Sequence, residues 1–250
     1  MTLAARVVMT NATQVEYRVL SGPKALARSV AEWLINRVEA VAGMPAVCLS
    51  GGSTPTLLYQ LLSEPPYRER FPWASVHWFW GDERYVEATD PRSNYGRARA
   101  VLFDHVPVPR AHLHPIDTHG TLEEAARLYE RELRAFASAA GRDQDHPLFA
   151  ATLLGLGTDG HTASLFPGDA ALRAKERWVT TVPEGRPPRI TLTLPTLASS
   201  GEIGFLVSGA AKRDVFAAVR RGADMPATRV TSDGRVRWFV DRAAAGQGIG

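Results

Sequence analysis

The sequence predicts an α/β fold built on a mainly parallel, open sheet with helices on both faces. Short apolar runs alternate along the chain with longer segments whose apolar residues recur every three or four positions. Most short runs are apolar throughout, which is typical of strands that are buried on both faces of a parallel sheet. No internal repeat and no Pro/Ser-rich linker divides the 250 residues. We therefore expect a single domain over residues 1–250, with flexible ends at 1–12 and 242–250.

The first half of the chain shows both periods. Val15, Tyr17 and Val19 alternate with polar residues, as in a half-buried strand. Residues 23–42 carry apolar side chains at helical spacing, and Pro23 suits the first turn of a helix. The same criteria predict strands at 46–49 and 76–80, and helices at 55–62 and 95–104.

The second half repeats the alternation. Residues 122–140 form a strongly amphipathic segment, which predicts a long helix. A shorter helix is expected at 210–220. Strands are predicted at 151–156, 178–182, 189–194, 203–207 and 237–240. Strands and helices in this order are typical of the doubly wound, Rossmann-like class.

Composition excludes several classes of protein. With 45% hydrophobic and 22% charged residues, the chain can form a core and is not disordered. The net charge of +3 is spread along the chain, so no nucleic-acid partner is expected. No apolar run is long enough to span a membrane and the first residues lack a signal-peptide pattern, so we expect no membrane partner and a cytoplasmic location. The single cysteine, Cys48, lies in an apolar strand and should be buried.

Ligands in open α/β sheets bind beyond the carboxyl ends of the strands, and residues 50–55 (SGGSTP) occupy such a place. Gly51 and Gly52 allow a sharp bend, and the N–H groups at a helix start can bind a phosphate. No Gly-Lys-[Ser/Thr] follows, which argues against a nucleoside triphosphate. The alternative is an ordinary turn with Ser53 or Thr54 as the helix cap.

A second group of polar residues follows the strand at 76–80. Residues 81–85 (GDERY) place acidic residues next to Arg84. Such a group can hold a hydroxyl-rich or anionic ligand. It can equally be a solvated turn with a weak local ion pair. Ser93 and Asn94, a little later, suggest a helix N-cap and no more.

The third strand end, residues 154–167 (LGLGTDGHTASLFP), contains Asp159 two residues before His161. Its Gly-x-Gly-x-x-Gly pattern is formally a dinucleotide fingerprint, but Pro167 stops any crossover helix too early. A histidine titrates near neutral pH and can act as a general base, and a nearby carboxylate can fix its tautomer. The alternative is a capping or core histidine. The flanking glycines favour the functional interpretation.

Two further basic residues lie at the starts of predicted elements. Arg189 opens a strand, and Lys212 lies in the first turns of a helix, where a cation is unfavourable unless an anion is close. His112 and His114 have the spacing of metal ligands, but no third ligand follows at a convincing distance, so no metal is expected.

Together, these segments resemble the 6-phosphogluconolactonase family. The motifs are SGGSTP, GDERYV with SN downstream, GLGTDGHTASLFPG, PRITLTLP and SGAAKR, in that order. The likeness runs from about Lys24 to Val240. GTDGHTASLFPG is the most specific motif, whereas SGGSTP is shared with related families.

The resemblance implies hydrolysis of 6-phospho-D-glucono-1,5-lactone to 6-phosphogluconate, in the oxidative pentose phosphate pathway, with no metal or organic cofactor. It makes His161 the general base, oriented by Asp159. It places the phosphate in the turn formed by Gly51, Gly52 and Ser53. The basic residues that would hold the phosphate are drawn from Arg84, Arg189 and Lys212.

Two alternatives remain. Glucosamine-6-phosphate deaminases share the SGG and DGH segments, but they typically follow DGH with a stretch resembling IAFNEP, which differs from residues 162–167 here. A non-catalytic sugar-phosphate sensor would need a DNA-binding segment, and only about 13 residues precede the first strand. The lactonase interpretation is favoured, and the oligomeric state stays open.

Overall fold

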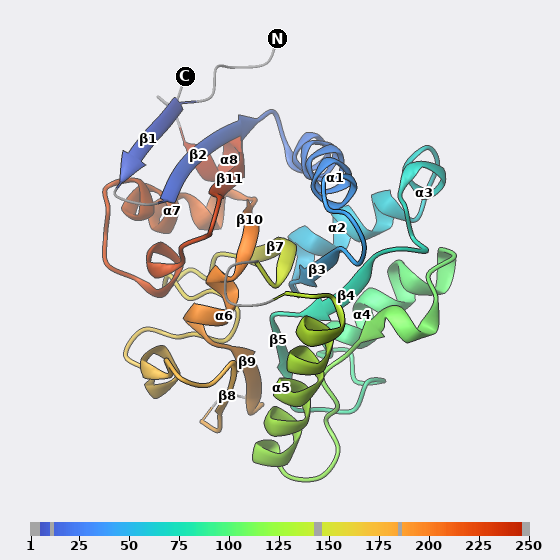
Figure 1. Cartoon of the computed structure of the whole chain (residues 1–250). Coiled ribbons are helices and arrows are strands. Elements are labelled where there is room, and N and C mark those ends of the chain that lie inside the picture. Colours follow the sequence, from blue (N-terminus) through green and yellow to red (C-terminus); the bar gives the residue numbers. More distant parts are fainter. Residues whose placement is uncertain (1–5, 11–12, 143–146, 185–186, 247–250) are drawn as a thin grey trace.

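The fold is organised around one large sheet (Figure 1). The computed structural model describes residues 6–10, 13–142, 147–184 and 187–246. The strands of this sheet are β1 (Arg6–Thr10), β2 (Thr13–Leu20), β3 (Ala46–Leu49), β4 (His77–Trp80), β6 (Leu113–His114), β7 (Phe149–Gly155), β10 (Ser200–Val207) and β11 (Arg235–Asp241). Their order is β1-β2-β11-β10-β7-β3-β4-β6, and every neighbouring pair except β1–β2 is parallel. The predicted mainly parallel α/β sheet is confirmed.

A second, smaller sheet corrects the predicted strand arrangement. β5 (Asp82–Arg84), β9 (Arg189–Leu192) and β8 (Val179–Val182) pair antiparallel, apart from the large sheet. The pattern of short apolar runs predicts β8 and β9 as strands of the mainly parallel sheet, and it gives no signal for β5. Only six residues separate β8 from β9, too few for the crossover that parallel neighbours need, so the two strands must pair antiparallel.

The helices expected at 23–42, 55–62, 95–104, 122–140 and 210–220 are all present, and three short helices at 67–70, 194–198 and 242–245 were not predicted. In chain order, the helices are α1 (Pro23–Glu39), α2 (Ser53–Leu62), α3 (Tyr67–Arg70), α4 (Asn94–Val101), α5 (Leu122–Ala139), α6 (Leu194–Ala198), α7 (Arg213–Arg220) and α8 (Arg242–Ala245). α1 begins with Pro23 in its first turn. α5 begins with a capping box in which Thr121 and Glu124 satisfy each other's backbone N–H groups. None of the helices in the described part of the chain combines the length and apolar character that crossing a bilayer needs.

The expected flexible ends are only partly comparable with the structure. Residues 1–5, 11–12 and 247–250 lie outside the described residues. Residues 6–10 form β1. Residues 242–245 form α8, in which Ala244 and Ala245 are buried, so the prediction of a flexible end is wrong for this segment. The Asp241 carboxylate caps α8 by accepting the N–H of Ala244.

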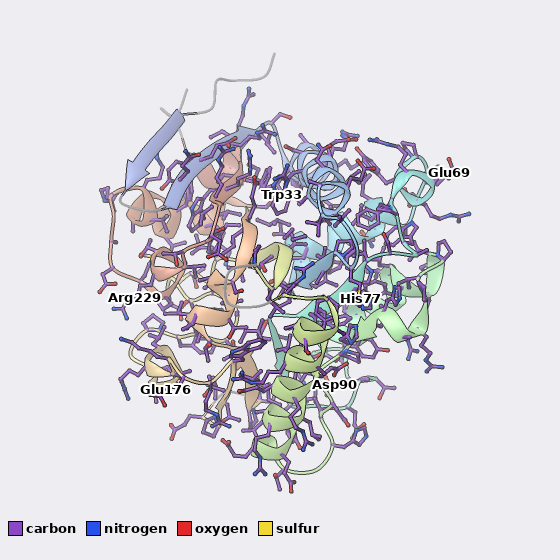
Figure 2. All side chains as sticks on the ribbon, in the orientation of Figure 1. Trp33, Glu69, His77, Asp90, Glu176 and Arg229 are labelled. Atoms are coloured by element: carbon purple, nitrogen blue, oxygen red, sulfur yellow. The ribbon has the colours of Figure 1, made fainter. Side chains whose placement is uncertain are left out.

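The core lies on both faces of the large sheet. Every residue of β3 and β4 is buried, including Cys48, as predicted. α1 packs on β7, β10 and β11, and Trp33 of α1 donates its ring N–H to Glu202 of β10 at 2.8 Å (Figure 2). α5 packs on β8 and β9 of the small sheet (Figure 1), and its Tyr129 and Phe136 also contact β4. The buried strand ends are therefore held firmly, which fixes the loops that follow them.

A histidine cluster lies beside β4. The ring of His77 stacks on that of His112, with centroids 4.0 Å apart. His77 also donates from Nδ1 to Nε2 of His114 at 2.9 Å, and His114 donates in turn to Glu132 at 2.7 Å. No three His, Cys, Asp or Glu side chains in the described part of the chain are arranged to hold a metal ion. Burial, with His112, His114 and Arg142 nearby, lowers the pKa of His77 to about 4.

This pKa predicts a loss of stability in mild acid. Between about pH 6.5 and pH 4 the unfolded chain binds a proton at residue 77 that the folded protein does not, so stability rises with pH there. At pH 5 this difference in pKa lowers the free energy of unfolding by about 2 kcal/mol relative to neutral pH. His77→Asn keeps a polar group near Nδ1 but cannot titrate, so it should lose about that much less stability than the wild type between pH 7 and pH 5, measured by urea unfolding.

His105→Asn, the same substitution at an exposed histidine, is the matched control. An equal loss of stability in His77→Asn and the wild type would contradict the assignment.

Candidate active site

A pocket of about 280 Å³ opens at the carboxyl ends of β3, β7 and β10. From β3 the chain proceeds outward through β4 and β6, and from β7 it proceeds the other way through β10 and β11. Ligands bind at such a switch point in open α/β sheets. Asp159 does not line the pocket, but it is hydrogen-bonded to His161, which does. The other predicted site residues all line the pocket: Gly51, Gly52, Ser53, Arg84, His161, Arg189 and Lys212.

The glycine turn after β3 presents free backbone N–H groups. The buried hydroxyl of Tyr59 accepts the N–H of Ser50 and donates to its carbonyl oxygen, which fixes the strand end. Gly52 has a φ of 109°, a conformation that favours glycine, and α2 begins at Ser53. Neither Ser53 nor Thr54 is the helix cap, because Gly52 occupies that position and no side chain caps the first turn. The N–H groups of this turn are thus available to an anion.

Two arginines face each other in the small sheet. Arg84 of β5 pairs in register with Arg189 of β9. The Nε atoms of both are buried and have no hydrogen-bond partner in the described structure. Burial, and next the charge of Arg84, lower the pKa of Arg189. Like charges directly opposite each other destabilise a sheet, and unpaired buried N–H groups add to that cost. An anion in the pocket would relieve both effects.

Lys212 adds a third cation. It ends a 3-10 turn (Ala210–Lys212) that immediately precedes α7, and it makes no ion pair with any described residue. The Asp241 carboxylate holds the loop before this turn, because it accepts hydrogen bonds from the Ser208 hydroxyl and the Gly209 N–H. Because Asp241 belongs to β11, the loop that carries Lys212 is attached to the large sheet.

His161 and Asp159 form a hydrogen-bonded pair in the turn after β7. His161 donates from Nδ1 to Oδ1 of Asp159 at 2.5 Å, and its backbone N–H donates to the same oxygen at 3.1 Å. Partial burial acts to raise the pKa of Asp159, but these two hydrogen bonds outweigh it and lower that pKa. In a neutral imidazole, a proton on Nδ1 leaves Nε2 as the hydrogen-bond acceptor. The ring is also packed against Phe166, with centroids 4.5 Å apart.

Two glycines allow this turn to form. A Cβ atom on Gly157 would overlap the His161 ring, and one on Gly160 would contact Met225 at 2.7–2.8 Å. The N–H of Gly157 donates to the carbonyl of His161, and that of Gly160 donates to the carbonyl of Gly157. Both N–H groups are therefore engaged within the turn, so neither is free to donate to the negatively charged oxygen that forms when water attacks a lactone carbonyl.

Two pocket residues, Asp82 and Asn94, and the neighbouring Ser164 were not among the predicted site residues. The carboxylate of Asp82 accepts the Ser164 hydroxyl at 2.6 Å and the Asn94 amide at 3.3 Å, and all three side chains are buried. Asp82 and Asn94 line the pocket. The GDER and SN motifs contain the signal, but the pairing joins residues 82 positions apart and cannot be inferred from spacing.

An Asp-x-His turn is not sufficient to make a site. Asp117 and His119 repeat the arrangement of Asp159 and His161, with the same 2.5 Å and 3.1 Å hydrogen bonds. The side chain of His119 is 75% exposed, however, against 30% for His161. His119 also lies away from the pocket lined by the three cations. The surroundings of His161 therefore distinguish it.

Comparisons with known proteins agree with this geometry. Residues 21–238 match the family described as glucosamine-6-phosphate isomerases/6-phosphogluconolactonase. A 6-phosphogluconolactonase from Synechocystis sp. is 39% identical over 216 residues, which cover 84% of this chain and 87% of that protein. The chain therefore belongs to the glucosamine-6-phosphate isomerase/6-phosphogluconolactonase family.

Solved structures show the same fold. The crystal structure of a 6-phosphogluconolactonase from Thermotoga maritima superposes with a TM-score of 0.77 at 32% identity, covering 91% of this chain and 100% of that one. A monomeric glucosamine-6-phosphate deaminase superposes with a TM-score of 0.74 at 22% identity, covering 92% of this chain and 98% of that one. The second likeness concerns the fold alone.

The contact at Gly157 gives a structural prediction. Gly157→Ala should fold but displace the His161 ring and break its hydrogen bond to Asp159, because the added Cβ overlaps the ring. Proton–nitrogen correlation spectra of the imidazole rings should show that His161 no longer holds its proton on Nδ1. Gly22→Ala is the control, since a Cβ there contacts nothing. An unchanged His161 spectrum in Gly157→Ala would show that the turn does not set the tautomer.

Proposed function

We propose that this protein hydrolyses 6-phospho-D-glucono-1,5-lactone to 6-phosphogluconate, as a carboxylic ester hydrolase of the oxidative pentose phosphate pathway. The observation that carries the proposal is the facing pair Arg84 and Arg189, whose Nε groups lack partners in the pocket that also contains His161. The names of the relatives at more than 30% identity support the same activity. The proposal includes a cytoplasmic location and no requirement for a metal or organic cofactor.

The phosphate would lie between the cations and the glycine turn. Arg84, Arg189 and Lys212 supply positive charge from three different elements. The N–H groups of the first turn of α2 supply hydrogen bonds of the kind that helix starts give to phosphates. Binding the remote phosphate also orients the lactone, so it contributes to turnover as well as to affinity.

His161 would act as the general base. Its Nε2 takes a proton from a water molecule as the water oxygen attacks the lactone carbonyl. When the tetrahedral intermediate collapses, the bond from the carbonyl carbon to the ring oxygen breaks, and the imidazolium returns the proton to that oxygen. Asp159, kept ionised by its hydrogen bonds from His161, stabilises the imidazolium between these two steps.

The deaminase alternative is less well supported. Residues 162–167 follow the lactonase motif, and Thr162 and Ser164 of this segment are buried. The Thr162 hydroxyl donates to the Gly155 carbonyl oxygen, and the Ser164 hydroxyl donates to the Asp82 carboxylate. A sugar-phosphate sensor would need no general base, whereas His161 is held in one tautomer at the pocket. Because the Asp159–His161 pair lies in the DGH segment that the deaminases share, residues 162–167 carry the distinction between the two enzymes.

Replacing His161 tests the proposal. His161→Ala should lower kcat for the phosphorylated lactone by about 10²–10⁴-fold, the usual value of general-base assistance, because the carboxylate left in the turn, Asp159, does not line the pocket. Binding of 6-phosphogluconate, measured by calorimetry, should persist. His119→Ala is a close control because it removes the histidine of the matching Asp-x-His turn. Its activity should equal that of the wild type.

Two results would contradict the proposal. Unchanged hydrolysis in His161→Ala would remove His161 from the mechanism. Ammonia release from glucosamine 6-phosphate by the wild type, with no lactone hydrolysis above the spontaneous rate, would establish the deaminase instead.

A further inference from the structure

Glu83 is a buried carboxylate without an ion-pair partner among the described residues. Its side chain is 1% exposed, although its neighbour Arg84 is a cation. Instead, Glu83 accepts four hydrogen bonds. Oε1 accepts the N–H groups of Arg84 at 2.7 Å and Asn94 at 2.8 Å, and Oε2 accepts the N–H of Tyr95 at 2.8 Å and the hydroxyl of Ser93 at 3.0 Å. Such complete pairing indicates a position fixed within the interior.

These bonds complete the start of α4. The N–H groups of Asn94 and Tyr95 are the first two of the helix and have no acceptor within it. The third, that of Gly96, donates to the Ser93 hydroxyl oxygen, and this hydroxyl donates to Glu83. A negative charge is favoured at a helix N-terminus. Glu83 therefore ties α4 to β5, ten residues earlier in the chain.

The consequence reaches the pocket through Asn94. This side chain is buried, lines the pocket and donates from Nδ2 to the Asp82 carbonyl at 2.9 Å. Its carboxamide lies so close to the glycine turn that a Cβ on Gly51 would overlap it. Asn94 thus occupies the space between the acidic end of β5 and the turn after β3. Nothing else in the described structure holds its backbone N–H.

We propose that Glu83 is a positioning residue of the lactone site, acting through Asn94 and the backbone of Arg84. One carboxylate holds the residue that packs on the glycine turn and the residue that carries a phosphate-binding guanidinium. Glu83 thereby sets the distance between the glycine turn and Arg84, which form the two sides of the proposed phosphate site. This inference rests on the proposed lactonase function.

Glu83→Gln tests the role with little change in shape. A carboxamide presents an NH₂ group where one carboxylate oxygen accepts two hydrogen bonds, so α4 should shift. The expected result is a roughly tenfold higher KM for 6-phosphogluconolactone, since hydrogen bonds to a charged group are lost. The fall in kcat should be smaller than the rise in KM, because the Asp159–His161 turn makes none of these contacts and only the orientation that the phosphate gives the lactone is affected. Glu87→Gln, at an exposed acid in the same segment, should leave both parameters unchanged.

A double-mutant cycle separates positioning from a general loss of stability. Asn94→Ala alone should raise KM, and Glu83→Gln combined with Asn94→Ala should raise KM by less than the product of the two single effects, because part of the effect of Glu83 passes through Asn94. Additive effects, or an unchanged KM in Glu83→Gln that folds normally, would overturn the positioning role. If Glu83→Gln does not fold, Asn94→Ala decides the question, and an unchanged KM there overturns the inference. Wild-type protein without lactone hydrolysis would instead overturn the proposed function, and this inference with it.

Discussion

Arg84 and Arg189 are held face to face by the register of two antiparallel strands, and the chemistry of the pocket depends on this arrangement. Two guanidinium groups in register repel each other, and the loss of water from their buried Nε groups adds to the cost. Asp82 and Glu83 offset part of it through their charge. Lys212 lines the same pocket and adds to the excess of positive charge. This excess is the basis on which we propose that the site binds a phosphate.

The large sheet brings the reacting groups to these cations. The change of direction between β3 and β7 leaves a crevice, and the glycine turn and the Asp159–His161 turn enter it from adjacent strands. The hydroxyls of two buried tyrosines form hydrogen bonds at the carboxyl ends of β3 and β4. Tyr59 bonds both polar backbone groups of Ser50, and Tyr129 does the same for Trp80, where neighbouring strand β6 has ended. These hydroxyls replace missing strand partners, so the site loops start from fixed points.

Local sequence predicted what local physics determines. Hydrophobic periodicity located α1 and α5 almost to the residue, and glycines at strand ends marked both pocket turns. The division into two sheets was missed because a three-residue strand, β5, has no periodicity to detect. Spacing also could not separate His161 from His119, which share the Asp-x-His pattern, because their difference is burial and neighbouring charge. Contacts such as Asn94 with Asp82 depend on the folded loops.

The most direct test of this account compares two lactones that differ only in the phosphate. Hydrolysis of 6-phospho-D-glucono-1,5-lactone and of unphosphorylated glucono-1,5-lactone would be measured with wild type and Arg189→Ala, each corrected for spontaneous opening. The account predicts a kcat/KM at least roughly 10²-fold higher for the phosphorylated lactone, from charge-assisted hydrogen bonds, and a loss in Arg189→Ala confined to that substrate. Equal rates on both lactones, or an equal loss on both in Arg189→Ala, would contradict it.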